Sequence, residues 1–249
     1  MRRLLVFLLC AVCCPLSVAQ ARVVDLLLVL AVDISRSIDE EEFTLQREGY
    51  AQALSDPSVI NAIRSGPMGA IAVTYMEWSG ADLQTVIIPW TVIDSAAPAQ
   101  KIAQILRSVP RPFGERTGVG AAIGASIALI EAAPHEGLRQ VIDISGDGRN
   151  SSGPPPSVFR DRAVEKGIII NALPIVNDKP TFGRIELDLP GFFRDEVIGG
   201  LGAFMQVAEG FKSFSAAVKA KLVREIAQRP PSPEQNPNET LIGVIPLGK

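Results

Sequence analysis

Two short segments of this sequence place oxygen-bearing side chains at spacings that suit a divalent metal ion. One runs from Asp33 to Ser37 and the other from Ser145 to Gly148, and each directly follows an apolar run. In the first segment Asp33, Ser35 and Ser37 alternate, so on a turn that leaves a strand their oxygens can converge on one point. In the second, glycines on both sides of Asp147 give the backbone freedom to present its carboxylate.

A third oxygen donor, Thr117, lies in the loop that opens the helix before the second segment. Thr117 also stands where a helix N-cap would, and capping is its alternative role. The five side chains together offer three hydroxyls and two carboxylates, which are the oxygen ligands that hard cations such as Mg²⁺ select. Because hydroxyls do not cancel the ion's charge, a metal whose carboxylates act through water stays electrophilic and can accept a carboxylate from a partner.

For these segments to meet, the apolar runs before them must be neighbouring strands of one sheet. Hydrophobic periodicity predicts strands over residues 23–32, 70–78, 85–93, 140–144, 168–176 and 204–207. It predicts helices over residues 39–54, 59–64, 97–109, 118–132, 157–166 and 212–227. Strands that alternate with helices predict an α/β protein, a Rossmann-like three-layer α/β/α sandwich with about six mostly parallel strands.

The connection between the second and third strands is a turn at residues 79–82. A gap this short allows only a hairpin, so one of these two strands runs antiparallel to its neighbour. In such folds ligands bind outside the carboxyl ends of the strands. Asp33 and Asp147 both stand at such ends, which places the candidate site there.

The first 21 residues have the features of an export signal. Two arginines precede an apolar stretch, and Ala19-Gln20-Ala21 offers the small-x-small pattern of a signal peptidase site. The stretch is short for a membrane span, which needs about 20 residues, and a retained anchor is the alternative. We expect cleavage before Arg22 and a periplasmic or secreted mature chain without a membrane span.

Removal of residues 1–21 changes the composition of the chain. The segment holds Cys10, Cys13 and Cys14, so the remainder has no cysteine, which excludes disulfides and cysteine-ligated zinc. Loss of two arginines lowers the net charge from −3 to −5, and a mildly acidic chain without basic runs argues against a nucleic-acid partner. We expect one domain over residues 22–229 and a proline-rich, poorly ordered tail over residues 230–249.

The set Asp33-x-Ser35-x-Ser37, Thr117 and Asp147-Gly148 resembles the metal-ion-dependent adhesion site (MIDAS) of von Willebrand factor A (vWA) domains. The resemblance covers about residues 23–227. Four sequence segments also resemble those of a group of secreted bacterial proteins of this fold with no assigned function. They are "LQREGYAQAL", "EWSG", "VIDISGDG" and "VIGG". The resemblance implies six strands with an antiparallel edge strand. It further implies protein binding through Mg²⁺, Mn²⁺ or Ca²⁺, a partner that presents an acidic side chain, and no catalysis.

Three residues near the predicted site have open roles. Arg36 occupies a position that is often small in the resembled family, and its charge could repel the metal or pair with an incoming acidic ligand; we favour the second role. Glu77 and Trp78 end a strand at the same edge of the sheet. They either border the ligand surface or belong to the core.

Two further function classes stand beside the binding module. One is a metal-assisted hydrolase, since a bound cation can activate water, but no general base is well placed beyond the metal carboxylates. The lone His135 precedes the strand at Gln140, so we expect it on a surface loop at the opposite end of the sheet from Asp147. The other class is a structural vWA domain whose degenerate site has lost its metal.

Overall fold

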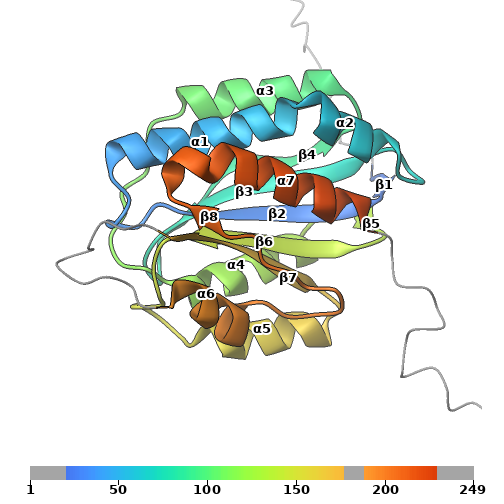
Figure 1. Ribbon diagram of the computed structural model, residues 1–249. Helices are drawn as coiled ribbons and strands as arrows, with labels where there is room; N and C mark the ends of the chain where they lie inside the picture. Colours follow the sequence, from blue (N-terminus) through green and yellow to red (C-terminus); the bar gives the residue numbers. More distant parts are fainter. Residues whose placement is uncertain (1–20, 177–187, 229–249) are drawn as a thin grey trace, which may run out of the picture.

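The computed structural model of the protein describes residues 21–176 and 188–228, where a six-stranded sheet lies between two layers of helices (Figure 1). The strands are β2 Leu26–Asp33, β3 Ile71–Trp78, β4 Gln84–Ile93, β6 Gln140–Gly146, β7 Ile169–Val176 and β8 Ala208–Glu209. Their order in the sheet is β4-β3-β2-β6-β7-β8. Two short strands, β1 Val23–Val24 and β5 Glu136–Gly137, pair separately. The predicted tail and all but the last residue of the predicted signal lie outside the described residues.

Every neighbouring pair in the large sheet is parallel except β3 with β4, which are antiparallel. β4 is the edge strand, so the hairpin predicted from the short turn is confirmed. The register aligns Asp33 with Trp78 across β2 and β3, and Val32 with Ser145 across β2 and β6. The carboxyl ends of β2, β3 and β6 therefore finish at one edge of the sheet.

The helices cover both faces of the sheet (Figure 1). They are α1 Glu40–Ser55, α2 Pro57–Arg64, α3 Ala96–Ser108, α4 Val119–Glu131, α5 Pro156–Glu165, α6 Leu189–Phe192 and α7 Phe214–Ala227. Helices α1, α2, α3 and α7 lie on one face, and α4, α5 and α6 lie on the other. A π-helical turn follows α6 at Phe193–Val197, and a 3₁₀ turn precedes α7 at Phe211–Ser213.

β2 is buried along its whole length because it contributes to both cores. Leu28, Leu30 and Val32 pack in the core under α1, α3 and α7, while Val29 and Ala31 pack in the core under α4 and α5. This explains the nearly continuous apolar run, which is typical of a central parallel strand covered on both faces. No helix in the described part of the chain is both long and apolar enough to cross a membrane.

Two predicted strands differ from the observed ones. The first is interrupted at Asp25, whose carboxylate accepts hydrogen bonds from the backbone N–H groups of Met68 (3.0 Å) and Ala70 (3.3 Å), so β1 and β2 are separate strands. The last strand is β8 at Ala208–Glu209 rather than residues 204–207. The Asn171 side chain accepts the Phe204 N–H at 2.8 Å, and Met205 makes only an isolated bridge.

Candidate metal centre

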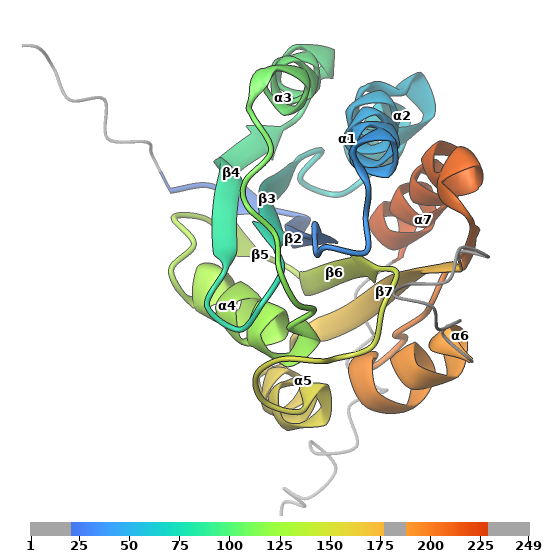
Figure 2. The ribbon, with the colours of Figure 1, turned by 90° about the vertical axis from the view of Figure 1, so that its left-hand side faces the viewer.

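Figure 2 looks onto the edge of the sheet where the loops after β2 and β6 lie. Asp33 is the last residue of β2 and is fully buried. Its backbone carbonyl accepts a hydrogen bond from Gln46 Nε2 at 2.8 Å, and its Oδ1 accepts one from the Ser35 N–H at 2.7 Å. Among the described residues, Asp33 Oδ2 has no hydrogen-bond partner. The carboxylate is therefore held in place with one oxygen unsatisfied.

The hydroxyls of Ser35 and Ser37 connect the β2 loop to Asp147. The two Oγ atoms lie 3.1 Å apart, and Ser37 Oγ donates to Asp147 Oδ1 at 2.6 Å. Asp147 follows β6 directly and is itself buried. Oxygens from two loops that are distant in sequence thus lie side by side, as the sequence predicts for a ligand site at this edge.

A glycine allows β6 to approach Asp33. A Cβ on Gly146 would lie 2.9 Å from Asp33 Oδ2 and would push the carboxylate aside. A Cβ on Gly148 would lie 3.5 Å from Thr117 Oγ1, which places the threonine hydroxyl beside the loop that carries Asp147. All five predicted donors therefore belong to three adjoining loops.

Thr117 does not cap α4, so that alternative role is wrong. The N-cap residue is Gly118, and no side chain caps the helix. The Thr117 carbonyl instead accepts the N–H groups of Ser151 (2.8 Å) and Ser152 (3.0 Å). These bonds hold the Thr117 loop against the Asp147 loop, and they leave the threonine hydroxyl unengaged in capping.

Electrostatics at Asp33 favour a cation. Burial raises the pKa of Asp33 well above its ordinary value, and the negative charge of Asp147 raises it further, while hydrogen bonds from Ser35 and from the Asp147 backbone N–H lower it. Across residues 21–176 and 188–228, no group of three or more His, Cys, Asp or Glu side chains could hold a metal ion. A cation here would depend on hydroxyls beside two carboxylates. That all-oxygen set, with an unsatisfied buried oxygen, fits a hard cation.

Arg36, Glu77 and Trp78 have different surroundings. Arg36 is exposed, and its backbone N–H donates to the Glu115 carbonyl at 2.8 Å, so it lies on the outer surface of the site loops. Glu77 and Trp78 are only 1% and 0% exposed. Of the two roles left open for these residues, their burial favours the core, where Glu77 pairs with Arg47 at 2.7 Å.

Two residues that support the site, Gln46 and Arg47, do not stand out in the sequence. Gln46 and Arg47 are polar, yet they lie on the buried face of α1 between Phe43 and Tyr50. Their positions three to four residues from these aromatic side chains were the available signal, because a polar residue at a core position of a helix needs buried partners. Those partners are the Asp33 carbonyl for Gln46 and Glu77 for Arg47.

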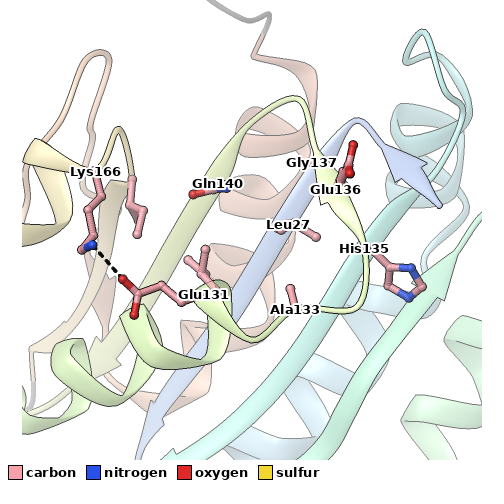
Figure 3. Close-up of a pocket in the computed structure, with 10 residues that line it drawn as sticks. Leu27, Glu131, Ala133, His135, Glu136, Gly137, Gln140 and Lys166 are labelled. Atoms are coloured by element: carbon pink, nitrogen blue, oxygen red, sulfur yellow. Dashed lines mark ion pairs between the residues drawn. The ribbon is translucent and has the colours of Figure 1, made fainter. Parts of the chain in front are cut away.

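A cavity of about 460 Å³ lies at the opposite end of the sheet (Figure 3). His135 is among its lining residues, together with the ion pair of Lys166 with Glu131 at 2.7 Å. His135 is thus far along the fold from Asp147, as expected from its place before β6. It cannot act as a general base for a metal bound between Asp33 and Asp147.

Comparisons with solved structures identify the fold. The pilus adhesin SpaC from Lactobacillus rhamnosus GG matches with a TM-score of 0.62 and 15% identity over 84% of this chain and 31% of that chain. Proximal thread matrix protein 1 (PTMP1) from the mussel byssus, with a zinc-occupied MIDAS motif, matches with a TM-score of 0.57 and 15% identity over 82% and 46%. A von Willebrand factor type A structure from Catenulispora acidiphila matches with a TM-score of 0.52 and 14% identity over 82% and 42%.

This chain spans less than half the length of these three proteins, and at such low identity the likeness establishes the fold alone. No curated protein matches the chain. One family does match, over residues 23–230, and its description is "Protein of unknown function (DUF1194)". The chain therefore belongs to the DUF1194 family and has the α/β fold of a vWA domain.

Proposed function

We propose that this protein is a divalent-cation-dependent protein-binding module without catalytic activity. Asp33, Ser35, Ser37, Thr117 and Asp147 would hold the ion, with Mg²⁺ as the expected metal and Mn²⁺ or Ca²⁺ as substitutes. The observation that carries the proposal is the unsatisfied Oδ2 of the buried Asp33, in a site whose second carboxylate, Asp147, repels it. A buried carboxylate in that position gains most from a cation.

The hydroxyl-rich donor set explains why binding is the expected outcome. When bound, the ion supplies an electrophilic position to which a partner can bring a carboxylate. Ser35 and Ser37 orient their oxygens through the contact between them, and Ser37 holds Asp147 in place. Two related folds point the same way, since one is described as a pilus adhesin and another as having a zinc-occupied MIDAS motif.

Metal titration tests the site directly. Calorimetry on chelator-stripped protein should show binding of Mg²⁺ and Mn²⁺ by wild type. Affinity should fall at least about tenfold in Asp33→Ala, equivalent to about 1.4 kcal/mol, because one of two carboxylates is lost. Asp161→Ala, which removes a carboxylate that is 64% exposed and lies on α5, is the matched control and should bind as wild type does.

Two results would contradict the proposal. Wild type that binds no metal at millimolar concentration would leave only the fold, in agreement with the degenerate-site alternative. Equal affinity in wild type and Asp33→Ala would place the ion elsewhere. The partner is tested next, by capture from an envelope extract with Mg²⁺ and then with chelator. Asp33→Ala as bait should lose the same proteins that chelator releases from wild type.

We further infer export, with a cleaved signal over residues 1–21, a mature domain over residues 22–229 and a periplasmic or secreted location. The Ala19-Gln20-Ala21 pattern supports this, and β1 begins two residues after it, at Val23. Intact mass of the protein from the cell envelope is the measurement. A mature N-terminus at Arg22 is expected, and a retained Met1 would contradict cleavage.

A further inference from the structure

Arg47 joins four parts of the molecule from the buried face of α1. Its Nε and Nη2 donate to Glu77 Oε1 and Oε2 at 2.7 and 2.9 Å, so it pairs in a bidentate way with the end of β3. Its Nη1 donates to the backbone carbonyls of Leu106 (3.2 Å) and Val109, and its Nη2 donates to that of Pro110 (3.3 Å) as well. These carbonyls lie where α3 ends and the loop that carries Thr117 begins. Arg47 therefore fixes the start of that loop.

Arg111 belongs to the same loop and reaches in the other direction. Its Nη2 donates to the carbonyls of Ile34 (3.2 Å) and Ile38 (2.8 Å), and its Nη1 donates to Glu40 Oε1 at 2.9 Å. Ile34 and Ile38 flank the two serines of the metal centre. Arg111 thus ties the loop that carries Thr117 to the loop that carries Ser35 and Ser37.

The Phe43 ring contacts the guanidinium groups of both arginines. The Cζ atoms of Arg47 and Arg111 lie 4.5 and 4.8 Å from the centroid of its ring. The ring is buried, and attraction between a guanidinium and an aromatic face increases when both are removed from water. The loops are also in close backbone contact, because a Cβ on Gly114 would lie 2.1 Å from the Ile34 carbonyl oxygen.

We propose that Phe43, Arg47, Glu77 and Arg111 form an arginine clamp that holds the Thr117 loop against the Ser35–Ser37 loop, so that the hydroxyl donors are in place before the metal binds. This inference rests on the proposed metal-dependent function. Donors that are ordered in advance cost no conformational entropy on binding, so the clamp raises metal affinity. The clamp residues are positioning residues, since none of them is a metal ligand.

Arg111 is the residue to substitute, because its side chain is 17% exposed and the fold should tolerate the change. A substitution of Arg47 would instead leave the buried Glu77 without its partner. Arg111→Met keeps the aliphatic stem and removes the fork of donors, and Arg111→Lys keeps the charge without the fork. Arg107→Met is the matched control, because Arg107 joins α3 to α1 through Glu48 at 2.7 and 2.8 Å, and none of its hydrogen bonds within the described part of the chain reaches a site loop.

The first readout is Mg²⁺ affinity by calorimetry on chelator-stripped protein, well below the melting temperature of every variant. We expect Arg111→Met to weaken Mg²⁺ binding about fivefold or more, Arg111→Lys to be intermediate, and Arg107→Met to bind like wild type. The second readout is amide hydrogen exchange in metal-free protein. Exchange over residues 112–118 should be faster in Arg111→Met and unchanged in Arg107→Met.

The outcomes separate the two proposals. Wild type that binds no Mg²⁺ would overturn the proposed function and this inference together. Metal binding by wild type with equal affinity in Arg111→Met would overturn the clamp alone and leave the function intact. A loss of affinity that Arg107→Met shares would also overturn it, because general destabilisation of the α1–α3 contact would then be the cause.

Discussion

The candidate metal centre at the carboxyl ends of β2 and β6 and the charge network beneath α7 each bury two carboxylates. In the network these are Asp143 on β6 and Glu225 on α7, and Lys221 lies between them, with its Nζ 2.6 Å from Asp143 Oδ1 and 3.3 Å from Glu225 Oε2. The Asn171 amide donates to Glu225 Oε1 at 2.7 Å. All three ionisable side chains are buried to within 2% of complete.

The candidate metal centre differs at its buried Asp33. Among the described residues no ion pair joins a basic side chain to Asp33, and its Oδ2 has no hydrogen-bond partner within normal geometry. Its surroundings supply hydroxyls, which orient charge without neutralising it. A structural carboxylate pair can thus be distinguished from a candidate ligand site, because a pair that is neutralised by a lysine of the same chain needs no cation from solution.

The largest effect on stability should come from removing the charge of Lys221 from the network. Lys221→Met would leave Asp143 and Glu225 buried without a counter-charge, and we expect it to lower the free energy of unfolding by about 3–5 kcal/mol. Urea denaturation measures this. Lys166→Met is the control, because its pair with Glu131 is 40–46% exposed and screened by water, so its loss should change stability little. If the two variants lose equal amounts of stability, Lys221 does not neutralise a buried carboxylate pair.

Titration of the network should be the next largest effect. The pKa of Asp143 is raised to about 7. Burial is the main cause, and the charge of Glu225 adds to it, while that of Lys221 opposes it. Because this folded-state pKa lies above the unfolded value of about 3.9, the stabilising contribution is complete below that value and is lost as pH rises through 7.

From pH 5 to pH 8 this single group should therefore cost wild type about 2–3 kcal/mol of stability. Asp143→Asn should not show this loss, since the amide resembles the protonated acid. Urea unfolding of both proteins in chelator at the two pH values gives the difference. Parallel pH dependence in the two proteins would show that Asp143 stays ionised beside Lys221.

A substitution at Asp33 is expected to increase the stability of the metal-free protein. Asp33→Asn removes the repulsion from Asp147 and keeps the oxygen that accepts the Ser35 N–H. We expect the metal-free protein to become more stable by on the order of 1 kcal/mol, whereas most core substitutions destabilise. Melting temperatures in chelator and in Mg²⁺ provide the test, because only wild type should gain from the ion. A less stable Asp33→Asn protein without metal would contradict this account of the site.

The sequence was sufficient for the parts of the site that depend on strand ends. Asp33 and Asp147 each follow an apolar run, and parallel strands bring their carboxyl ends to one edge. Thr117 was placed in the correct loop but with a wrong alternative role, because the chain uses Gly118 as the N-cap.

Residues whose role depends on packing between distant elements could not be assigned. Every residue of β3 is buried, so alternation along the strand does not distinguish a core Glu77 from a surface one. Its partner Arg47 lies on another element. Lys221 and Glu225 have the spacing of an ordinary exposed helix pair, and their burial follows only from the packing of α7 on the sheet.

The smallest effect should come from the loss of the Ser37 hydroxyl, a neutral ligand of the proposed metal ion. Ser37 Oγ donates to Asp147 Oδ1 at 2.6 Å, but Ser37→Ala leaves both carboxylate charges in place. Because Mg²⁺ keeps several waters, one of them can replace the lost hydroxyl, and we expect Mg²⁺ affinity to fall only about two- to fivefold. Ser79→Ala is the control, since Ser79 follows β3 at the same edge, is buried, and has an Oγ without a hydrogen-bond partner among the described residues. Calorimetric titration of both variants should show the loss in Ser37→Ala alone. If Ser79→Ala weakens binding and Ser37→Ala does not, the ion lies over β3, and the unsatisfied oxygen of Asp33 is not its ligand.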